Sequence, residues 1–158
     1  MKVLVRVTLV SLLSFAVHAS AESRVCIGGD LDRLSPAQKS GCFNSASRVR
    51  SQPVTLHAPS DWHFFVVCTE SDWQMYASFS KRKAVDLNRI GADTDIQNRT
   101  TFFRGEWLLA SGNKGLNELV AHEVAAAVLQ SADEVAIHKQ VASWSRDASE
   151  NFSLQASR

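Results

Sequence analysis

The sequence lacks several features that would assign it to a common functional class. It has no excess of positive charge, because 17 lysine and arginine residues face 16 aspartate and glutamate residues. That balance does not favour a nucleic-acid partner or a strongly anionic membrane surface. No G-x-S-x-G segment occurs, so no serine-hydrolase triad is predicted. Local signals predict a turn at Gly28-Gly29, with no strand before it and no helix directly after it, so no phosphate-binding loop is expected there.

Long apolar runs are also scarce, and the strongest one lies at the N-terminus. This segment has three parts: a basic start with Lys2 and Arg6, an apolar run over Val7–Val17, and the small residues 19–21. This order predicts a cleaved secretory signal peptide over residues 1–21. The run is well short of the roughly 20 residues that a membrane helix needs, so no transmembrane segment is expected after cleavage. We therefore expect an exported protein, periplasmic or secreted.

Cleavage after Ala21 leaves a chain of the size of one domain. It removes 21 of the 158 residues and two of the 17 basic ones, which leaves 137 residues with 15 basic and 16 acidic side chains. A chain of this length buries a core of its own. We predict a single globular domain over residues 22–146, followed by a frayed tail over 147–158 where the apolar pattern ends.

Cysteine is limited to Cys26, Cys42 and Cys68. In an oxidising compartment we expect a disulfide between Cys26 and Cys42, which would tie the N-terminal loop to the first helix. Cys68 ends an apolar strand and is expected to be a buried free thiol. The three spacings match no zinc-ligand pattern.

Local signals predict an α+β fold, with a small, mostly antiparallel sheet backed by helices. The strongest helix start is Ser35-Pro36, with Gln38 completing a capping box. The strand signals are aromatic and β-branched runs, and Gly105 is expected to kink the last of them. The expected helices are 36–50, a short one from Thr69 to Phe79, 116–130 and 131–144, and the expected strands are 62–68, 84–87 and 100–109.

One pair of residues in this pattern has catalytic potential. His122 and Glu123 lie in the middle of the expected helix 116–130, which is apolar or small on nearly every side. Burying two ionisable side chains without partners costs several kcal/mol, so this pair calls for an explanation. In the zinc-peptidase motif H-E-x-x-H, two histidines one turn apart bind the metal, and the glutamate deprotonates the bound water.

Around this pair, residues 62–147 resemble the small zincin-like (gluzincin-type) metallopeptidase domains of exported bacterial proteins. The resemblance is carried by VVCTESDW at 66–73, TTFFRG at 100–105 and LVAHE at 119–123. It implies a zincin-like fold with a buried His-Glu helix. It also implies that the strand before this helix is an edge for a peptide substrate, and that a later helix supplies a third, carboxylate ligand. Asp147, in Trp144-Ser145-Arg146-Asp147, matches that ligand.

The sequence departs from the motif at the second histidine, because Ala126 stands four residues after His122. Without it, too few ligands remain for a zinc site with an open water position. Our first hypothesis is therefore an exported, non-catalytic zincin-like domain, a pseudoenzyme with a binding or assembly role. Its partner would be an unidentified protein or peptide, and it would need no cofactor. The alternative is an active zinc metallopeptidase with ligands His122, His138 and Asp147 and with Glu123 as the catalytic base.

A third interpretation has no relation to peptidases. In a small periplasmic structural domain, His122 would donate a hydrogen bond to a nearby carbonyl group. Glu123 would pair with an arginine of the preceding strand segment, either Arg99 or Arg104. On this interpretation the two residues stabilise the core and bind no metal.

Overall fold

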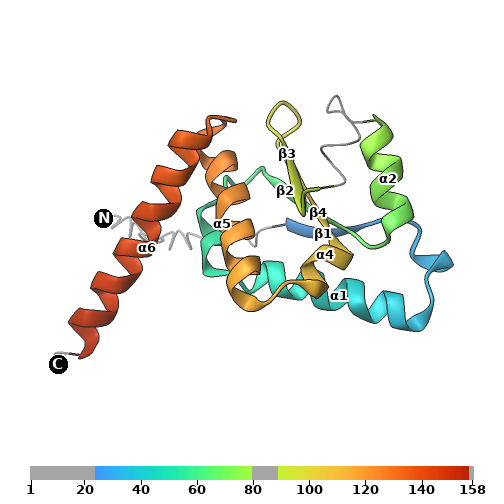
Figure 1. Ribbon diagram of the computed structural model, residues 1–158, viewed down its shortest axis with the longest axis horizontal. Coiled ribbons are helices and arrows are strands. Elements are labelled where there is room, and N and C mark those ends of the chain that lie inside the picture. The colour runs from blue at the N-terminus through green and yellow to red at the C-terminus, as the bar shows by residue number, and fades with distance from the viewer. Residues whose placement is uncertain (1–23, 80–88, 157–158) are drawn as a thin grey trace, which may run out of the picture.

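The computed structural model describes residues 24–79 and 89–156, and for residue 24 and residues 147–156 it describes the backbone alone. At its centre is a four-stranded sheet in the order β1-β2-β4-β3 (Figure 1). The strands β1 and β2 are parallel, as are β2 and β4, whereas β3 is antiparallel to β4. The strand bounds are β1 Arg24–Gly28, β2 His63–Val67, β3 Ala92–Asp95 and β4 Thr100–Arg104.

The mixed α and β composition is as expected, but the expectation of a mostly antiparallel sheet is wrong. The helix α1 (Pro36–Arg50) lies between β1 and β2, and α2 (Glu70–Phe79) follows β2 before the chain reaches β4. A helical crossover returns the chain to the same end of the sheet, so the strands that it joins run parallel. The strands β1 and β3 were not predicted from the sequence, and the strand expected at 84–87 lies outside the described residues.

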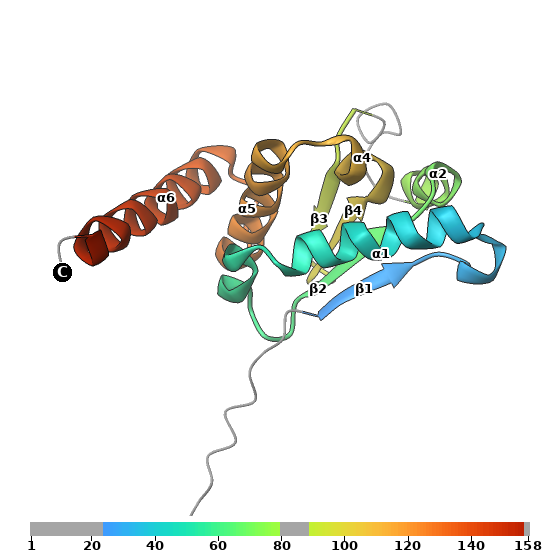
Figure 2. The same ribbon diagram turned by 90° about the horizontal axis from the view of Figure 1, so that it is seen from below.

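Helices cover both faces of the sheet (Figures 1 and 2). The inward side chains of β2 and β4, such as Phe64 and Phe103, form the main core with α1, α4 (Gly105–Ala110) and α5 (Asn113–Leu129). On the opposite face, Trp73 of α2 packs against Val67. This alternation follows from the period of two along a strand.

The segment expected to be a strand over 100–109 changes to a helix at Gly105. A Cβ atom at this position would lie 2.8 Å from the carbonyl oxygen of Val67, which is closer than packing allows. Glycine therefore lets the start of α4 pass against the end of β2. The expected kink is in fact the boundary between β4 and α4.

The helix α6 (Glu134–Ala156) is longer than expected. It begins at Glu134, three residues after the predicted start at 131. Its cap is Asp133, whose carboxylate accepts a hydrogen bond of 2.9 Å from the backbone N–H of Val135. The helix continues past Trp144, so the tail that we expected to lack structure is helical through Ala156. Figure 2 shows α6 extending away from the sheet beyond its contact with α5. No helix among the described residues is long and apolar enough to cross a membrane.

The predicted disulfide is wrong in one partner. Cys42 of α1 is bonded to Cys68 at the end of β2, with 5.1 Å between their Cα atoms, and Cys26 is an exposed free thiol. Val25 and Ile27 of β1 pack into the core beneath α1, so Cys26 between them points to the other face of the sheet. It therefore cannot reach Cys42, whereas Cys68 lies under the helix.

Candidate functional site

The helix α5 places His122 and Glu123 between the sheet and α6. Its buried residues Val120 and Val124 pack into the main core, and Ala125 and Ala126 pack against Ile137 of α6. The His122 side chain is 29% exposed, and Glu123 is 8% exposed. The predicted helix is thus confirmed, and the pair lies at the border between core and surface.

Glu123 accepts a hydrogen bond from a hydroxyl group, and the two arginines expected to pair with it bind elsewhere. The Thr94 hydroxyl on β3 donates to its Oε2 atom over 2.5 Å. Arg99 forms an ion pair with Asp61, and Arg104 forms one with Glu70. The correction follows from the sheet order, which places β3 beside β4 and under α5.

The bond to Glu123 ends a chain of three hydrogen bonds, of which the first is buried and the other two are partly buried. The indole Nε1–H of Trp62 donates to Thr101 Oγ1 over 3.0 Å, and 2.8 Å separate the Thr101 and Thr94 hydroxyls. An indole N–H only donates, and a hydroxyl has one hydrogen. Because Thr94 gives its hydrogen to Glu123, Thr101 must donate to Thr94. The Glu123 carboxylate thus completes a directional network in the core.

The ligand set of a zincin does not fit this structure. The second-ligand position holds Ala126, which is 5% exposed and packs against Ile137. An alanine offers no donor atom, so the second ligand of the motif is missing at this position. The side chain of Asp147 lies outside the described side chains. Its backbone stands nine residues after His138 on α6, a rise of about 13 Å.

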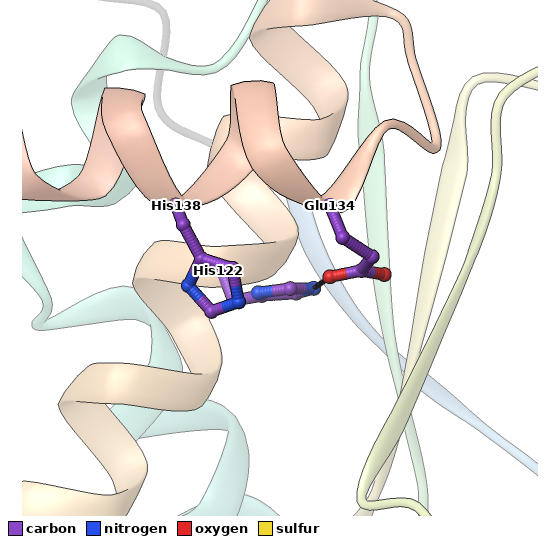
Figure 3. Close-up of side chains that lie close together, drawn as sticks. All are labelled: His122, Glu134 and His138. Atoms are coloured by element: carbon purple, nitrogen blue, oxygen red, sulfur yellow. Dashed lines mark ion pairs between the residues drawn. The ribbon is translucent and has the colours of Figure 1, made fainter.

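The structure instead brings together His122, Glu134 and His138, as Figure 3 shows. One potential ligand atom from each of these side chains lies within 4.8 Å of the others. The His122 Nε2 atom is 3.4 Å from Glu134 Oε2, and the two imidazole rings meet edge to face with 5.6 Å between their centroids. His122 therefore contacts a carboxylate of α6, where we expected a backbone carbonyl.

Sequence reasoning identified both histidines of this group but missed Glu134. Glu134 lies within the helix predicted over 131–144, and it occupies the first turn of α6. Its spacing was the available signal, because Glu134 and His138 are four residues apart and so lie on one face of a helix. Which face points to His122 depends on how α6 packs against α5, and local sequence does not specify that.

The three side chains border a cleft of about 640 Å³ between α5, α6 and the start of β3. Burial lowers the pKa of His122 below its ordinary value. The Glu134 carboxylate opposes this lowering, and His138 adds to it. A histidine in this setting is neutral at pH 7, the form in which imidazole binds metals.

No protein family, no curated protein and no solved structure matches the chain. The function therefore has to be inferred from the residues and the geometry of the chain itself.

Proposed function

We propose that this chain is an exported, non-catalytic domain related to the zincins, which binds an extended peptide or protein segment without cleaving it. The signal-like segment 1–21 supports export, although it lies outside the described residues. The disulfide between Cys42 and Cys68 also supports export, because such bonds persist in oxidising compartments.

The observation that carries the non-catalytic assignment is the burial of Ala126 against Ile137. The position that holds the second zinc ligand in H-E-x-x-H forms part of the contact between α5 and α6. Glu123, the base of that motif, accepts the hydroxyl of Thr94 and so has a structural role in the core. Packing thus explains Ala126, and the hydrogen bond from Thr94 explains Glu123, without a role for either in catalysis.

The proposed binding surface is the outer edge of β3. The resemblance implied that the strand before the His-Glu helix is an edge, and this is wrong, because that strand is β4 and it lies between β2 and β3. Within the described ranges β3 is paired with β4 alone, so β3 is the edge strand beside the cleft. Clefts of about 640 Å³ and 580 Å³ border this strand. An extended peptide adds to such an edge through backbone hydrogen bonds, and neighbouring clefts accept its side chains.

A second candidate function is an active metallohydrolase in which Glu134 takes the ligand role expected for Asp147. The observation that favours it is the approach of His138 to His122, which sequence alone did not require. Two histidines and one glutamate form a ligand set of catalytic zinc sites, and Glu123 borders the same cleft.

One experiment separates the two candidates. The purified mature protein is incubated with a mixed library of unstructured decapeptides, with and without Zn²⁺, and cleaved and co-eluting peptides are identified by mass spectrometry. Our proposal expects retained peptides and no cleavage. Zinc-dependent cleavage that is lost in Glu123→Gln would establish the second candidate. A result in which no peptide is retained and none is cleaved would favour a purely structural domain.

Export is tested by a separate experiment on the N-terminus of the protein. Intact-mass analysis of the protein recovered outside the cytoplasm should show an N-terminus at Glu22. An Arg substitution at Leu12 in the apolar run should keep the protein inside the cell as an uncleaved precursor. Recovery of the uncleaved form outside the cell would contradict the signal assignment.

A further inference from the structure

We propose that His122, Glu134 and His138 bind one divalent transition-metal ion, with Zn²⁺ as the expected metal, and thereby clamp the start of α6 onto α5. These ligands differ from the zincin set, since two of the three come from α6 and none is four residues from His122. The proposal does not depend on the proposed function, because a metal clamp serves a binding domain as well as an enzyme.

The distances suit a zinc ion after small side-chain movements. Zinc binds imidazole nitrogen and carboxylate oxygen at about 2.0 to 2.2 Å, so tetrahedral ligand atoms lie about 3.3 Å apart. The Nε2 atom of His122 and Oε2 of Glu134 are already 3.4 Å apart, and no pair in the group exceeds 4.8 Å. Glu134 and His138 are exposed, so their side chains are free to rotate inward.

The backbone fixes the arrangement on both sides. On α6, Glu134 and His138 lie one turn apart and point to the same side (Figure 3). On α5, His122 is held at the border of the core by the packing of its neighbours Val120 and Val124. The two helices are held together by Ile137, which lies between the two α6 ligands in the sequence and packs on Ala126.

The ligand types select the metal. Imidazole nitrogen with one carboxylate suits zinc and its first-row neighbours, whereas Mg²⁺ and Ca²⁺ prefer sites made of oxygen alone. Three protein ligands leave a fourth position for water, and all three side chains border the 640 Å³ cleft from which water can enter. An ion pair between His122 and Glu134 alone does not involve His138. Loss of the His138 imidazole therefore distinguishes a metal site from a simple ion pair.

The test is zinc binding by metal-free protein, measured by titration against a chromophoric chelator. We expect the wild type to bind one equivalent of Zn²⁺. In each of His122→Ala and His138→Ala, the affinity for Zn²⁺ should fall by about tenfold or more. Glu118→Gln is the matched control, because Glu118 lies one turn before His122 and borders the same cleft. Zinc binding unchanged in the His122→Ala/His138→Ala double variant would overturn the proposal, as would equal loss in the control.

Thermal unfolding provides a second measurement that does not need catalysis. Excess Zn²⁺ should raise the Tm of the wild type by about 5 °C or more, and Mg²⁺ should leave it unchanged. His138→Ala exposes no core, so this variant should fold with the circular dichroism spectrum of the wild type but show no zinc-dependent shift. Absence of both zinc uptake and a Tm shift in folded wild-type protein would refute the site. Peptide cleavage would contradict the proposed function but not the site.

Discussion

Trp62 and Glu123 lie at the two ends of one chain of buried and partly buried hydrogen bonds. The indole N–H of Trp62 donates to Thr101, and the Thr94 hydroxyl donates to Glu123. Contact between the two threonine hydroxyls joins these halves across β3 and β4. A carboxylate that would be costly in an apolar helix thereby becomes the acceptor that completes a polar network.

The network predicts a specific effect of Thr94. Replacement by valine keeps the shape but removes the hydroxyl that donates to Glu123, so the buried Oε2 atom loses this bond. Thr94→Val should lower the free energy of unfolding by about 1 to 3 kcal/mol in urea denaturation. Thr94→Ser retains the hydroxyl and should cost less than half as much. Equal losses in the two variants would show that the hydroxyl contributes little.

The disulfide between Cys42 and Cys68 closes a loop with a sequence separation of 26 residues. Its loss in Cys42→Ser/Cys68→Ser should lower the free energy of unfolding by about 3 kcal/mol, mainly because the unfolded chain gains freedom. Cys26→Ser should change it by less than about 0.5 kcal/mol, since Cys26 is exposed and unbonded. A non-reducing peptide map that joined Cys26 to Cys42 would contradict the structure.

Gly105 and Gly112 form a matched pair for testing the junction of β4 and α4. A Cβ atom at Gly105 would meet the Val67 carbonyl oxygen at 2.8 Å, while one at Gly112 would meet nothing within 4 Å. Gly105→Ala should therefore cost about 1 to 3 kcal/mol in thermal unfolding, because the backbone has to shift. Gly112→Ala should cost about 1 kcal/mol or less, because the added Cβ meets no atom and only the glycine at the N-cap of α5 is lost. Similar Tm values for the two variants would argue against the close contact.

The attachment of α6 depends on Ile137, which is 2% exposed. Ile137→Ala should lower stability by about 2 to 4 kcal/mol, since it opens a cavity against Ala125 and Ala126. Val135→Ala is the control, because Val135 lies on the same turn of α6 but is 63% exposed. Hydrogen exchange should show faster opening of α6 in Ile137→Ala alone. Unchanged exchange would mean that other contacts hold the helix.

The helices were predictable because their signals act over three or four residues. Ser35 and Gln38 form the capping box expected for α1, and the apolar spacing of α5 specified that helix to within three residues at its start. The edge strand β3 was missed because Ala92–Asp95 is short and has no apolar alternation. The longer α6 was missed because its last turns have no apolar pattern.

The sequence by itself determined the starts of α1 and α2, the central strand β2, the signal-like segment and the alanine at position 126, where H-E-x-x-H has its second histidine. Tertiary structure alone decided the partners of Cys42, of Glu123 and of His122. These pairings join residues that are distant in sequence, and they depend on which strands run parallel and on how α6 packs against α5. No local pattern encodes those arrangements, because they arise from burying the apolar faces of separate elements together.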